Sequence, residues 1–504
     1  MERSVKKSPV KHFIICLIAG ASLPLAFAPI GYAVIGIISP AVLFFLWYKS
    51  SPKSAFILGY AYGLGMFGTG VNWLHISINL FGGVNLAGAL FATYVLVAFL
   101  ALYPAVVGWA GRKYCFSNSA WLLLMVPALW TLAEWCRSWI LTGFPWLNLG
   151  YSQTDTLLAG FSPVFGAYGI SWLVCLNAAL LVYIFYAAKP GKLAAVTGLI
   201  FIWGLSIPVN SIHWTTPDAE EKSVVIIQAA IPQELKWQPE IQKRTVDLYL
   251  ALSGPYWGIV DFIVWPETAI PMFYHQADEL IKDLQTLTKY HNTGFLSGVP
   301  FMDLQTRKYY NSIIVIGRNN GIYLKRHLVP FGEYLPMDRW LRPILNILRI
   351  PMSAFSPGTG RPLLEVAGVP AGVSICYEDV FGEEIIDAMP EAKFHINVSN
   401  DAWFGDSLAP HQHLQMARMR ALETGRYLVR STNTGISAII DERGKIVSRS
   451  PQFEPDVLVG TVRMFSGSTP YSLFGNWLVI TVSIMVLLIC SISNSKYIKN
   501  RSDQ

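Results

Sequence analysis

The sequence predicts a multi-span α-helical membrane domain joined to an α/β sandwich domain. Hydrophobic residues make up 53% of the 504 residues and charged residues only 14%, whereas soluble proteins carry roughly a quarter of charged residues. The charge is also unevenly distributed. Residues 12–210 and 475–493 are almost uncharged, while residues 211–470 have the composition of an ordinary globular domain. These observations indicate a membrane protein with a soluble insert.

Eight apolar runs are long enough to cross a hydrocarbon core of about 30 Å. They lie near residues 12–28, 30–48, 55–78, 86–109, 119–136, 164–187, 193–210 and 475–493. The first run also resembles a secretory signal, but further runs follow it at once, so we expect an uncleaved helix. The predicted domains are a transmembrane domain of about seven helices (1–210), a soluble domain (211–474), and a last helix with its tail (475–504).

Lysine and arginine residues flank the apolar runs and predict their orientation. If the N-terminus is cytoplasmic, every basic loop falls on the cytoplasmic side, as the positive-inside rule requires. These loops contain Lys49, Lys53, Arg112, Lys113, Lys189 and Lys192, and the C-terminal tail contains Lys496, Lys499 and Arg501. Both termini are then cytoplasmic, and residues 211–474 lie outside the cytoplasm. The net charge of +6 is explained by these anchors, so we expect no binding of nucleic acid.

The soluble region alternates short strands rich in Val and Ile with amphipathic helices, which fits an α/β sandwich. Strands are expected at 223–230, 261–265, 293–299, 309–317, 370–375, 394–398, 427–430, 435–441 and 457–462. Helices are expected at 239–252, 276–291 and 411–424.

Three polar residues of this region follow or lie between predicted strands. Glu267 follows strand 261–265, Cys376 follows strand 370–375, and Lys325 lies between them. Strand ends that face a common crevice are a usual place for an active site in such folds. Cys376 is also the only cysteine in residues 211–474, so it has no disulfide partner within that domain.

This set of residue types suits acyl transfer. A thiol is only slightly ionised at neutral pH, so it needs a base to become a nucleophile, and a partly desolvated Glu267 can serve. Attack on a carbonyl produces an oxyanion. Lys325 and the backbone N–H of Tyr377, directly after Cys376, can stabilise that charge.

Several stretches resemble motifs of known families. They are Trp265-Pro-Glu267, Lys325 ahead of Leu328-Val-Pro-Phe-Gly-Glu333, Cys376-Tyr-Glu378, Asn397-Val-Ser-Asn-Asp-Ala-Trp-Phe-Gly405 and Arg430-Ser-Thr-Asn-Thr-Gly435. These resemble the Glu-Lys-Cys triad and downstream motifs of the nitrilase superfamily. Another stretch, from Glu134-Trp-Cys-Arg137 to Trp146, resembles the membrane part of bacterial apolipoprotein N-acyltransferases, a family that the chain resembles over nearly its whole length.

The resemblance implies a nitrilase-like αββα sandwich in the periplasm, carried by a protein of the bacterial inner membrane. It implies that an acyl chain moves from a membrane phospholipid to Cys376 as a thioester. The chain then passes to the α-amine of an S-diacylglyceryl cysteine at the N-terminus of an apolipoprotein. Glu267 would be the base and Lys325 the oxyanion stabiliser. No cofactor is implied.

The resemblance also implies roles for four neighbouring residues. Glu333 would orient Lys325, while Tyr377 and Glu378 would shape the site. Trp237 matches a family position near the lipid pocket, with an ordinary structural anchor before Pro239 as the alternative.

Some alternatives stay open at this stage. Glu134 and Arg137 lie in an apolar run, where ionisable groups are costly; they form either a buried structural pair or a contact to lipid headgroups. His411 and His413 do not share a helix face, and we expect no metal site. The whole chain could instead be a membrane-tethered amidase or nitrilase that hydrolyses a small C–N substrate, or a scaffold without activity.

Overall fold

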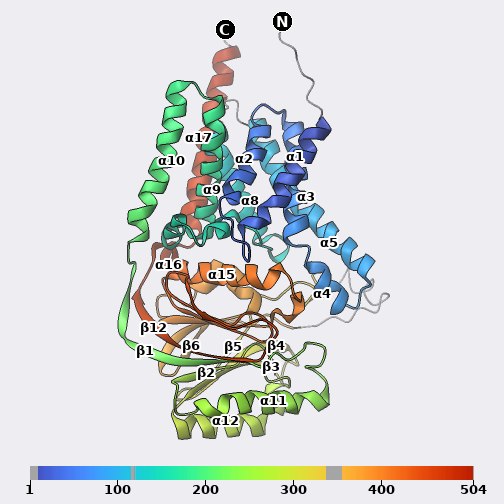
Figure 1. The fold of residues 1–504 in the computed structure, drawn as a ribbon, viewed down its shortest axis with the longest axis vertical. Helices are drawn as coiled ribbons and strands as arrows, with labels where there is room; N and C mark the ends of the chain where they lie inside the picture. Colours follow the sequence, from blue (N-terminus) through green and yellow to red (C-terminus); the bar gives the residue numbers. More distant parts are fainter. Residues whose placement is uncertain (1–8, 115–118, 120, 337–354, 503–504) are drawn as a thin grey trace. The chain divides into compact units, whose positions relative to one another are not determined.

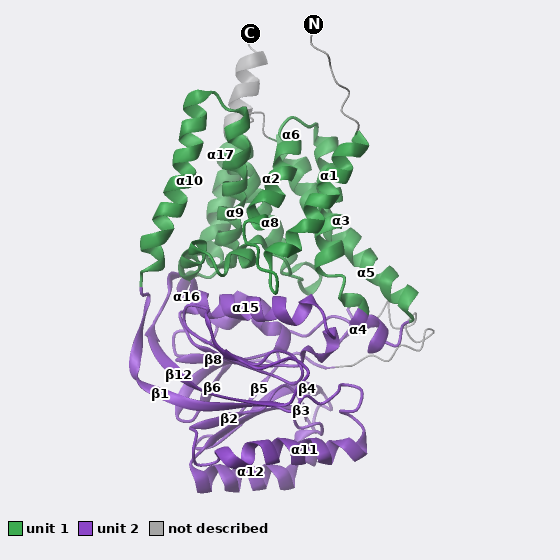
Figure 2. Cartoon of the chain, viewed as in Figure 1, with its two compact units in different colours: residues 1–75, 85–212, 474–504 green, residues 76–84, 213–473 purple. Residues whose placement is uncertain are grey.

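The structure is a computed structural model that describes residues 9–114, 119, 121–336 and 355–502. The chain forms two compact units, shown in different colours in Figure 2. Unit 1 consists of Met1–His75, Asn85–Ile212 and Phe474–Gln504, and unit 2 of Ile76–Val84 and His213–Leu473. The short segment Ile76–Val84 therefore packs with the later part of the chain, although its neighbours in sequence belong to unit 1.

Unit 1 is helical. Its main helices are α1 (Pro9–Ser22), α2 (Ile35–Trp47), α3 (Pro52–Gly70), α5 (Leu86–Leu100), α6 (Leu102–Tyr114), α8 (Val126–Arg137), α9 (Ser162–Tyr186), α10 (Lys189–Asn210) and α17 (Trp477–Ser502). Helix α4 (Leu74–Leu80) follows α3 after a short break, so the predicted run 55–78 is not one continuous helix. The break follows two glycines of the last α3 turns, and the capping residue Val71 has left the helical conformation.

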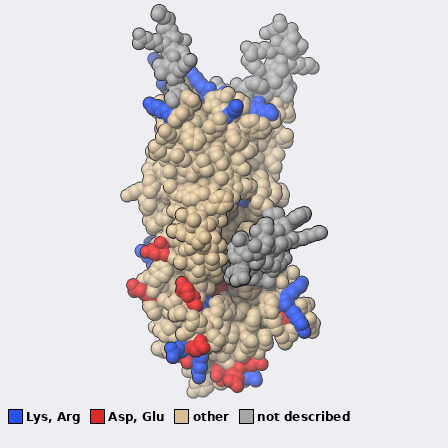
Figure 3. All heavy atoms as spheres, turned by 90° about the vertical axis from the view of Figure 1, so that its right-hand side faces the viewer, with Lys and Arg blue, Asp and Glu red and all other residues tan. Residues whose placement is uncertain are grey.

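Four helical segments among the described residues are long and apolar enough to cross a membrane. They are Pro9–Ala26, Leu86–Tyr114, Leu157–Tyr186 and Lys189–Asn210. Helices Ile35–Trp47 and Trp477–Ile492 are apolar but shorter. In the upper part of Figure 3, Lys and Arg gather at one end of unit 1, next to a broad band almost free of charge. The number of spans predicted from sequence, eight, stays a prediction.

Glu134 and Arg137 are both buried in unit 1, with 3% of each residue exposed. Glu134 accepts hydrogen bonds from Trp130 Nε1 and from the Leu149 N–H, each at 2.9 Å. Arg137 donates to Asn148 Oδ1 at 2.6 Å. Because Asn148 and Leu149 belong to the stretch after α8, the two side chains hold that stretch against the helix. This favours the structural interpretation over a contact with lipid headgroups.

Unit 2 contains two six-stranded sheets. The first has the order β12-β1-β2-β3-β4-β5 and the second β11-β10-β9-β8-β7-β6. Their strands are β1 (Thr215–Gln228), β2 (Phe262–Val264), β3 (Gly294–Met302), β4 (Tyr309–Ile316), β5 (Gly321–Leu324), β6 (Leu363–Val366), β7 (Val369–Ile375), β8 (Phe394–Ser399), β9 (Leu428–Thr432), β10 (Ala438–Ile440), β11 (Ile446–Arg449) and β12 (Asp456–Gly467).

The two sheets pack face to face, with helices on their outer faces (Figure 1). One core cluster takes apolar side chains from both sheets, including Val264 of β2 and Ile375 of β7. A second cluster packs α11 (Pro239–Ser253) and α12 (Asp278–His291) on the first sheet, and a third packs α15 (Leu408–Thr424) on the second. The unit is therefore an αββα sandwich.

All nine strands and all three helices predicted for the soluble region are present, with shifted ends. Strand β1 begins at Thr215 rather than Ser223, because its polar first half pairs with β12 in a long antiparallel ribbon. Helix α15 begins at Leu408, since Pro410 is tolerated in a first turn that the Ser407 side chain caps. Three strands were missed: β5, β6 and β11. All three are four-residue strands at sheet edges, where sequence patterns are weakest.

Candidate active site

Three predicted site residues lie directly beyond strand ends, and all three are buried. Glu267 follows β2 after Trp265-Pro266, Lys325 follows β5, and Cys376 follows β7. Their exposed fractions are 8%, 1% and 8%. A charged residue is rarely buried to this extent unless it is paired. The buried charges of Glu267 and Lys325 therefore need partners within the fold.

Asn311 of β4 links two carboxylates. Its Nδ2 donates to Glu267 Oε1 at 2.7 Å and to Glu333 Oε1 at 3.0 Å. The other Glu333 oxygen lies 2.8 Å from Lys325 Nζ and also accepts the Val329 N–H at 2.8 Å. Glu333 therefore contacts Lys325 directly, and its predicted orienting role stays a prediction.

The ammonium group of Lys325 is charged and faces more than one anion. Burial lowers the pKa of Lys325, but the carboxylates of Glu333 and Glu267 raise it more, so the net pKa is above its ordinary value. Although Nζ is close to Glu333, it makes no well-aligned hydrogen bond within the part of the chain that the structure describes. Its N–H groups are thus available to a further acceptor, such as an oxyanion.

Cys376 lies at a sharp turn where β7 passes into the short helix η8 (Cys376–Val380). Its φ is +50°, in the left-handed region that non-glycine residues seldom adopt and that often marks functional sites. Burial raises the pKa of the Cys376 thiol, and the charge of Glu267 raises it further against the opposing charge of Lys325. The resting thiol is therefore protonated, and nucleophilic attack needs a base at that moment.

Glu378 ties the Cys376 turn to the segment that carries Lys325. Its Oε2 accepts the Ile375 N–H at 2.7 Å. Its Oε1 accepts the Tyr323 hydroxyl at 2.8 Å and the Arg326 N–H at 2.6 Å. Burial raises the pKa of Glu378 to about 7, with a smaller contribution from Glu384. Ile375 directly precedes Cys376, and Arg326 directly follows Lys325. Glu378 therefore fixes the position of Cys376 relative to Lys325.

The remaining two predicted residues differ in exposure. The Tyr377 ring is buried and packs edge-on against the rings of His327 and Phe381. Its backbone N–H directly follows the candidate nucleophile. Trp237 has an exposed fraction of 49% and precedes α11, so its ring lies largely at the surface of unit 2.

The sequence did not reveal a buried charge cluster formed by Asp379, Asp401, His413 and Arg430. Arg430 donates to Asp379 Oδ2 at 2.7 Å and to Asp401 Oδ2 at 3.0 Å. The two ring nitrogens of His413 lie 2.7 Å from Asp379 Oδ1 and 2.9 Å from Asp401 Oδ1. Burial and Arg430 lower the pKa of His413, but the two aspartates outweigh them and raise it to about 9. The cluster thus balances two positive and two negative charges.

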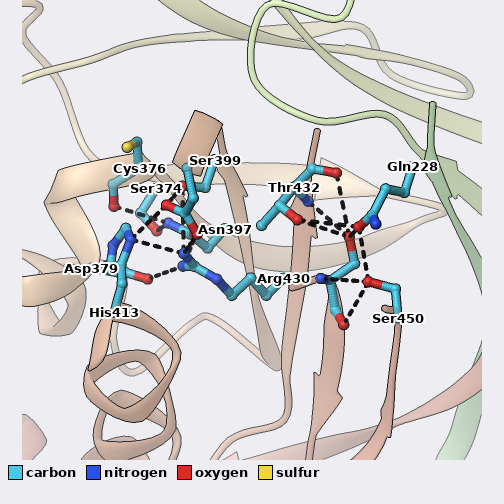
Figure 4. A network of polar contacts seen from close by, with 12 residues as sticks. Gln228, Ser374, Cys376, Asp379, Asn397, Ser399, His413, Arg430, Thr432 and Ser450 are labelled. Atoms are coloured by element: carbon cyan, nitrogen blue, oxygen red, sulfur yellow. Dashed lines mark hydrogen bonds and ion pairs between the residues drawn. The ribbon is translucent and has the colours of Figure 1, made fainter. Parts of the chain in front are cut away.

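Asn397 connects this cluster to the turn at Cys376 (Figure 4). Its Oδ1 accepts from Arg430 at 2.7 Å, and its Nδ2 donates to Ser374 Oγ at 2.9 Å and to the Cys376 carbonyl oxygen at 3.4 Å. The motifs at 397–405 and 430–435 contain Asn397, Asp401 and Arg430. Their pattern indicated a family likeness, but only the fold shows that they meet beneath Cys376.

A second polar network joins the two sheets. Gln228, at the end of β1, accepts hydrogen bonds on Oε1 from Ser437 at 2.7 Å, Ser450 at 2.8 Å and Thr432 at 3.3 Å. This network lies at the end of β9, next to the buried charge cluster (Figure 4). Among the described residues, no three His, Cys, Asp or Glu side chains are arranged to hold a metal ion.

Two family models match the chain. Residues 19–180 match the apolipoprotein N-acyltransferase N-terminal domain, and residues 226–468 match the carbon-nitrogen hydrolase family. The second match, together with the two packed six-stranded sheets, confirms the nitrilase-like sandwich expected from the sequence.

Relatives named apolipoprotein N-acyltransferase match nearly the full length. The protein of Methylococcus capsulatus is 43% identical over 95% of this chain and 96% of its own. That of Nitrosomonas europaea is 42% identical over 95% and 97%, and that of Coxiella burnetii 39% over 94% and 99%. With this identity over almost the whole of both chains, the chain belongs to the apolipoprotein N-acyltransferase family.

Proposed function

We propose that this chain transfers an acyl chain from a phospholipid, through a thioester on Cys376, to the N-terminal α-amine of a diacylated apolipoprotein. The observation that carries the proposal is that Glu267, Lys325 and Cys376 each follow a strand end and lie close enough for the charges of Glu267 and Lys325 to act on the Cys376 thiol, in a chain of this family. A buried carboxylate, a buried ammonium group and a protonated thiol are the groups that the chemistry requires.

In the first half-reaction, Glu267 takes the Cys376 proton as the sulfur attacks the ester carbonyl. Lys325 and the Tyr377 N–H stabilise the tetrahedral oxyanion. The C–O bond then breaks, and the lysophospholipid oxygen leaves with the proton returned by Glu267. In the second half-reaction, a neutral α-amine attacks the thioester and gives a proton to Glu267. The C–S bond breaks, and the Cys376 sulfur is protonated again.

Four further residues support these steps in the proposal. Glu333 orients Lys325 through the 2.8 Å contact, and Glu378 fixes the nucleophile turn against the Lys325 segment. The buried Tyr377 ring shapes the site beside its own N–H, and the exposed Trp237 ring offers an apolar surface to an acyl chain.

We also propose that unit 1 is embedded in the bacterial inner membrane with eight spans, and that residues 211–474 form a periplasmic catalytic domain. Large apolar side chains with high exposed fractions, such as Phe91, Phe185 and Ile200, support contact with lipid. A phosphatase fused after residue 350 should be active in the periplasm, and a reporter fused at Lys189 should be cytoplasmic. The reverse pattern would contradict this topology.

Mass spectrometry of the Cys376 peptide tests the proposed function. After incubation of the purified full chain with phospholipid, the peptide should gain the mass of one acyl group. Cys376→Ala should remove the acylated species without unfolding the protein, whereas Cys136→Ala should retain it. No acyl mass on Cys376 in the parent, or full acyl transfer by Cys376→Ala, would contradict the proposal. Hydrolysis of a small C–N substrate, the alternative function, has no specific support in the site.

A further inference from the structure

Lys236 is a buried lysine that the proposed chemistry does not use. It lies in the loop between β1 and α11, and only 2% of it is exposed. Its neighbours Leu235 and Trp237, by contrast, have exposed fractions of 39% and 49%. Moving an ammonium group from water into the protein interior costs on the order of several kcal/mol unless other groups compensate for the lost hydration. That cost is comparable to the stability of a small domain. The loop therefore directs the charged Lys236 side chain into the interior.

The Lys236 side chain reaches Glu267. Lys236 Nζ donates a hydrogen bond to the Glu267 backbone carbonyl oxygen at 3.1 Å. The Glu267 carboxylate accepts from Asn311 on Oε1, while its Oε2 has no hydrogen-bond partner within the described part of the chain. The ionised form of the Glu267 carboxylate is thus stabilised by one hydrogen bond, on Oε1, and by nearby positive charge.

The loop that delivers Lys236 is itself held by side-chain amides. Asn433 accepts the Ile231 N–H at 3.0 Å and donates to the Ile231 carbonyl at 2.8 Å. Asn400 donates to Gln233 Oε1 at 2.7 Å. Because Asn400 and Asn433 follow β8 and β9, the loop is fixed to the second sheet, while Lys236 reaches Glu267 beyond the first. The position of the ammonium group is therefore determined before any substrate binds.

Charged groups around Glu267 shift its pKa in both directions. Burial raises the pKa of Glu267, and the Glu333 carboxylate raises it further, whereas the charges of Lys325 and Lys236 lower it. Cys376, from the end of β7, is neutral at rest. Lys325 is in direct contact with Glu333 at 2.8 Å. Lys236 is the other ammonium group acting on Glu267, and it has no carboxylate within ion-pair distance among the described residues.

We propose that Lys236 is a positioning residue for the catalytic base. Its ammonium group anchors the Glu267 main chain, and its charge keeps the Glu267 carboxylate ionised and able to take the Cys376 proton. This inference rests on the proposed function, since it gives Lys236 a role only if Glu267 acts as that base.

The proposal has a specific pH signature. Burial lowers the pKa of Lys236 to about 8, so the lysine is charged across the acidic range in which Glu267 titrates. Removing this charge raises the pKa of Glu267. The rate of thioester formation then falls at a higher pH than in the parent, and the loss of rate is largest in acid. A lysine that only holds the loop would lower the rate equally at every pH.

The experiment measures single-turnover thioester formation on Cys376 of the purified full chain, with phospholipid vesicles, from pH 5 to pH 9. Lys236→Met removes the charge and the donor. Lys236→Gln keeps a donor for the carbonyl without the charge, and Lys236→Arg keeps both. The exposed Lys243 of α11, as Lys243→Met, is the matched control. Melting temperatures are compared first, and Lys236→Gln replaces Lys236→Met if the latter does not fold.

In Lys236→Met and Lys236→Gln the acid limb of the pH–rate profile should shift to higher pH by about one unit. At a given pH on that limb the rate of thioester formation should fall about tenfold, with a smaller loss near pH 9. Lys236→Arg and Lys243→Met should keep the acid limb of the parent. Parallel profiles for the parent and both neutral variants would overturn this proposal while leaving the proposed function intact. Failure of the parent to form the thioester at any pH would instead overturn the proposed function.

Discussion

The ammonium group of Lys325 lies 2.8 Å from Glu333 Oε2. Asn311 donates to the other oxygen of the same carboxylate and also to Glu267. Glu267, the proposed base, and Lys325, the proposed oxyanion stabiliser, are thus connected through the Asn311 amide and the Glu333 carboxylate. A change at either end of this connection should alter the position of the other.

Lys325→Ala should slow thioester formation by about 3 kcal/mol of activation free energy, or more than a hundredfold, because it removes a preorganised donor to the oxyanion. Lys325→Arg should restore little, since a planar guanidinium does not reproduce a point charge in a tight site. Single-turnover rates at saturating phospholipid measure both. Near-parent turnover by Lys325→Arg would mean that a positive charge alone is sufficient, and would contradict a role for the precise position of the Lys325 ammonium group.

Arg430→Met should destabilise unit 2 by about 3 to 5 kcal/mol, because it removes the guanidinium that pairs with both buried carboxylates, Asp379 and Asp401. Thermal unfolding of the purified chain measures the loss. Arg463 provides the matched control: it pairs with Glu221 at 2.7 Å, but both side chains are largely exposed. Arg463→Met should therefore leave the melting temperature nearly unchanged. Equal effects of the two substitutions would show that the buried charge cluster contributes no special stability.

The buried charge cluster should also give the fold a defined pH dependence. The pKa of His413 is raised to about 9 in the folded chain, above its ordinary value of 6.5. Its contribution to stability is then fully present below about pH 6.5 and is lost as the pH rises through about 9. The melting temperature of the parent should fall between pH 7 and 10 more steeply than that of His413→Gln. The difference between the two curves removes the contributions of other groups, and parallel curves would contradict a charged His413.

The sequence was informative where chemistry follows a local pattern. Glu267 and Cys376 could be proposed as site residues because each follows a short apolar strand with strong β propensity, and the structure contains both strands. Lys325 was proposed from its motif, although the strand that precedes it, β5, was not predicted. That strand has four residues at a sheet edge, and Ile322 within it has an exposed fraction of 43%.

Contacts between distant segments could not be predicted in the same way. Arg430 pairs with Asp379 and Asp401, which lie 51 and 29 residues away in the sequence. No periodic pattern of residues predicts such a contact. Lys236 is a similar case. Its neighbour Trp237 matches a family position in the sequence, whereas the inward direction of Lys236 depends on amide contacts from Asn400 and Asn433.

The discharge of the Cys376 thioester tests the central claim most directly. A transferase must keep water from its acyl intermediate, whereas a hydrolase must admit water. With phospholipid alone, the parent should hold a long-lived acyl thioester. A diacylated lipopeptide with a free α-amine should discharge it quickly and become N-acylated, and the same lipopeptide with an acetylated amine should not. Rapid release of free fatty acid without any acceptor, or equal discharge by both lipopeptides, would contradict the account.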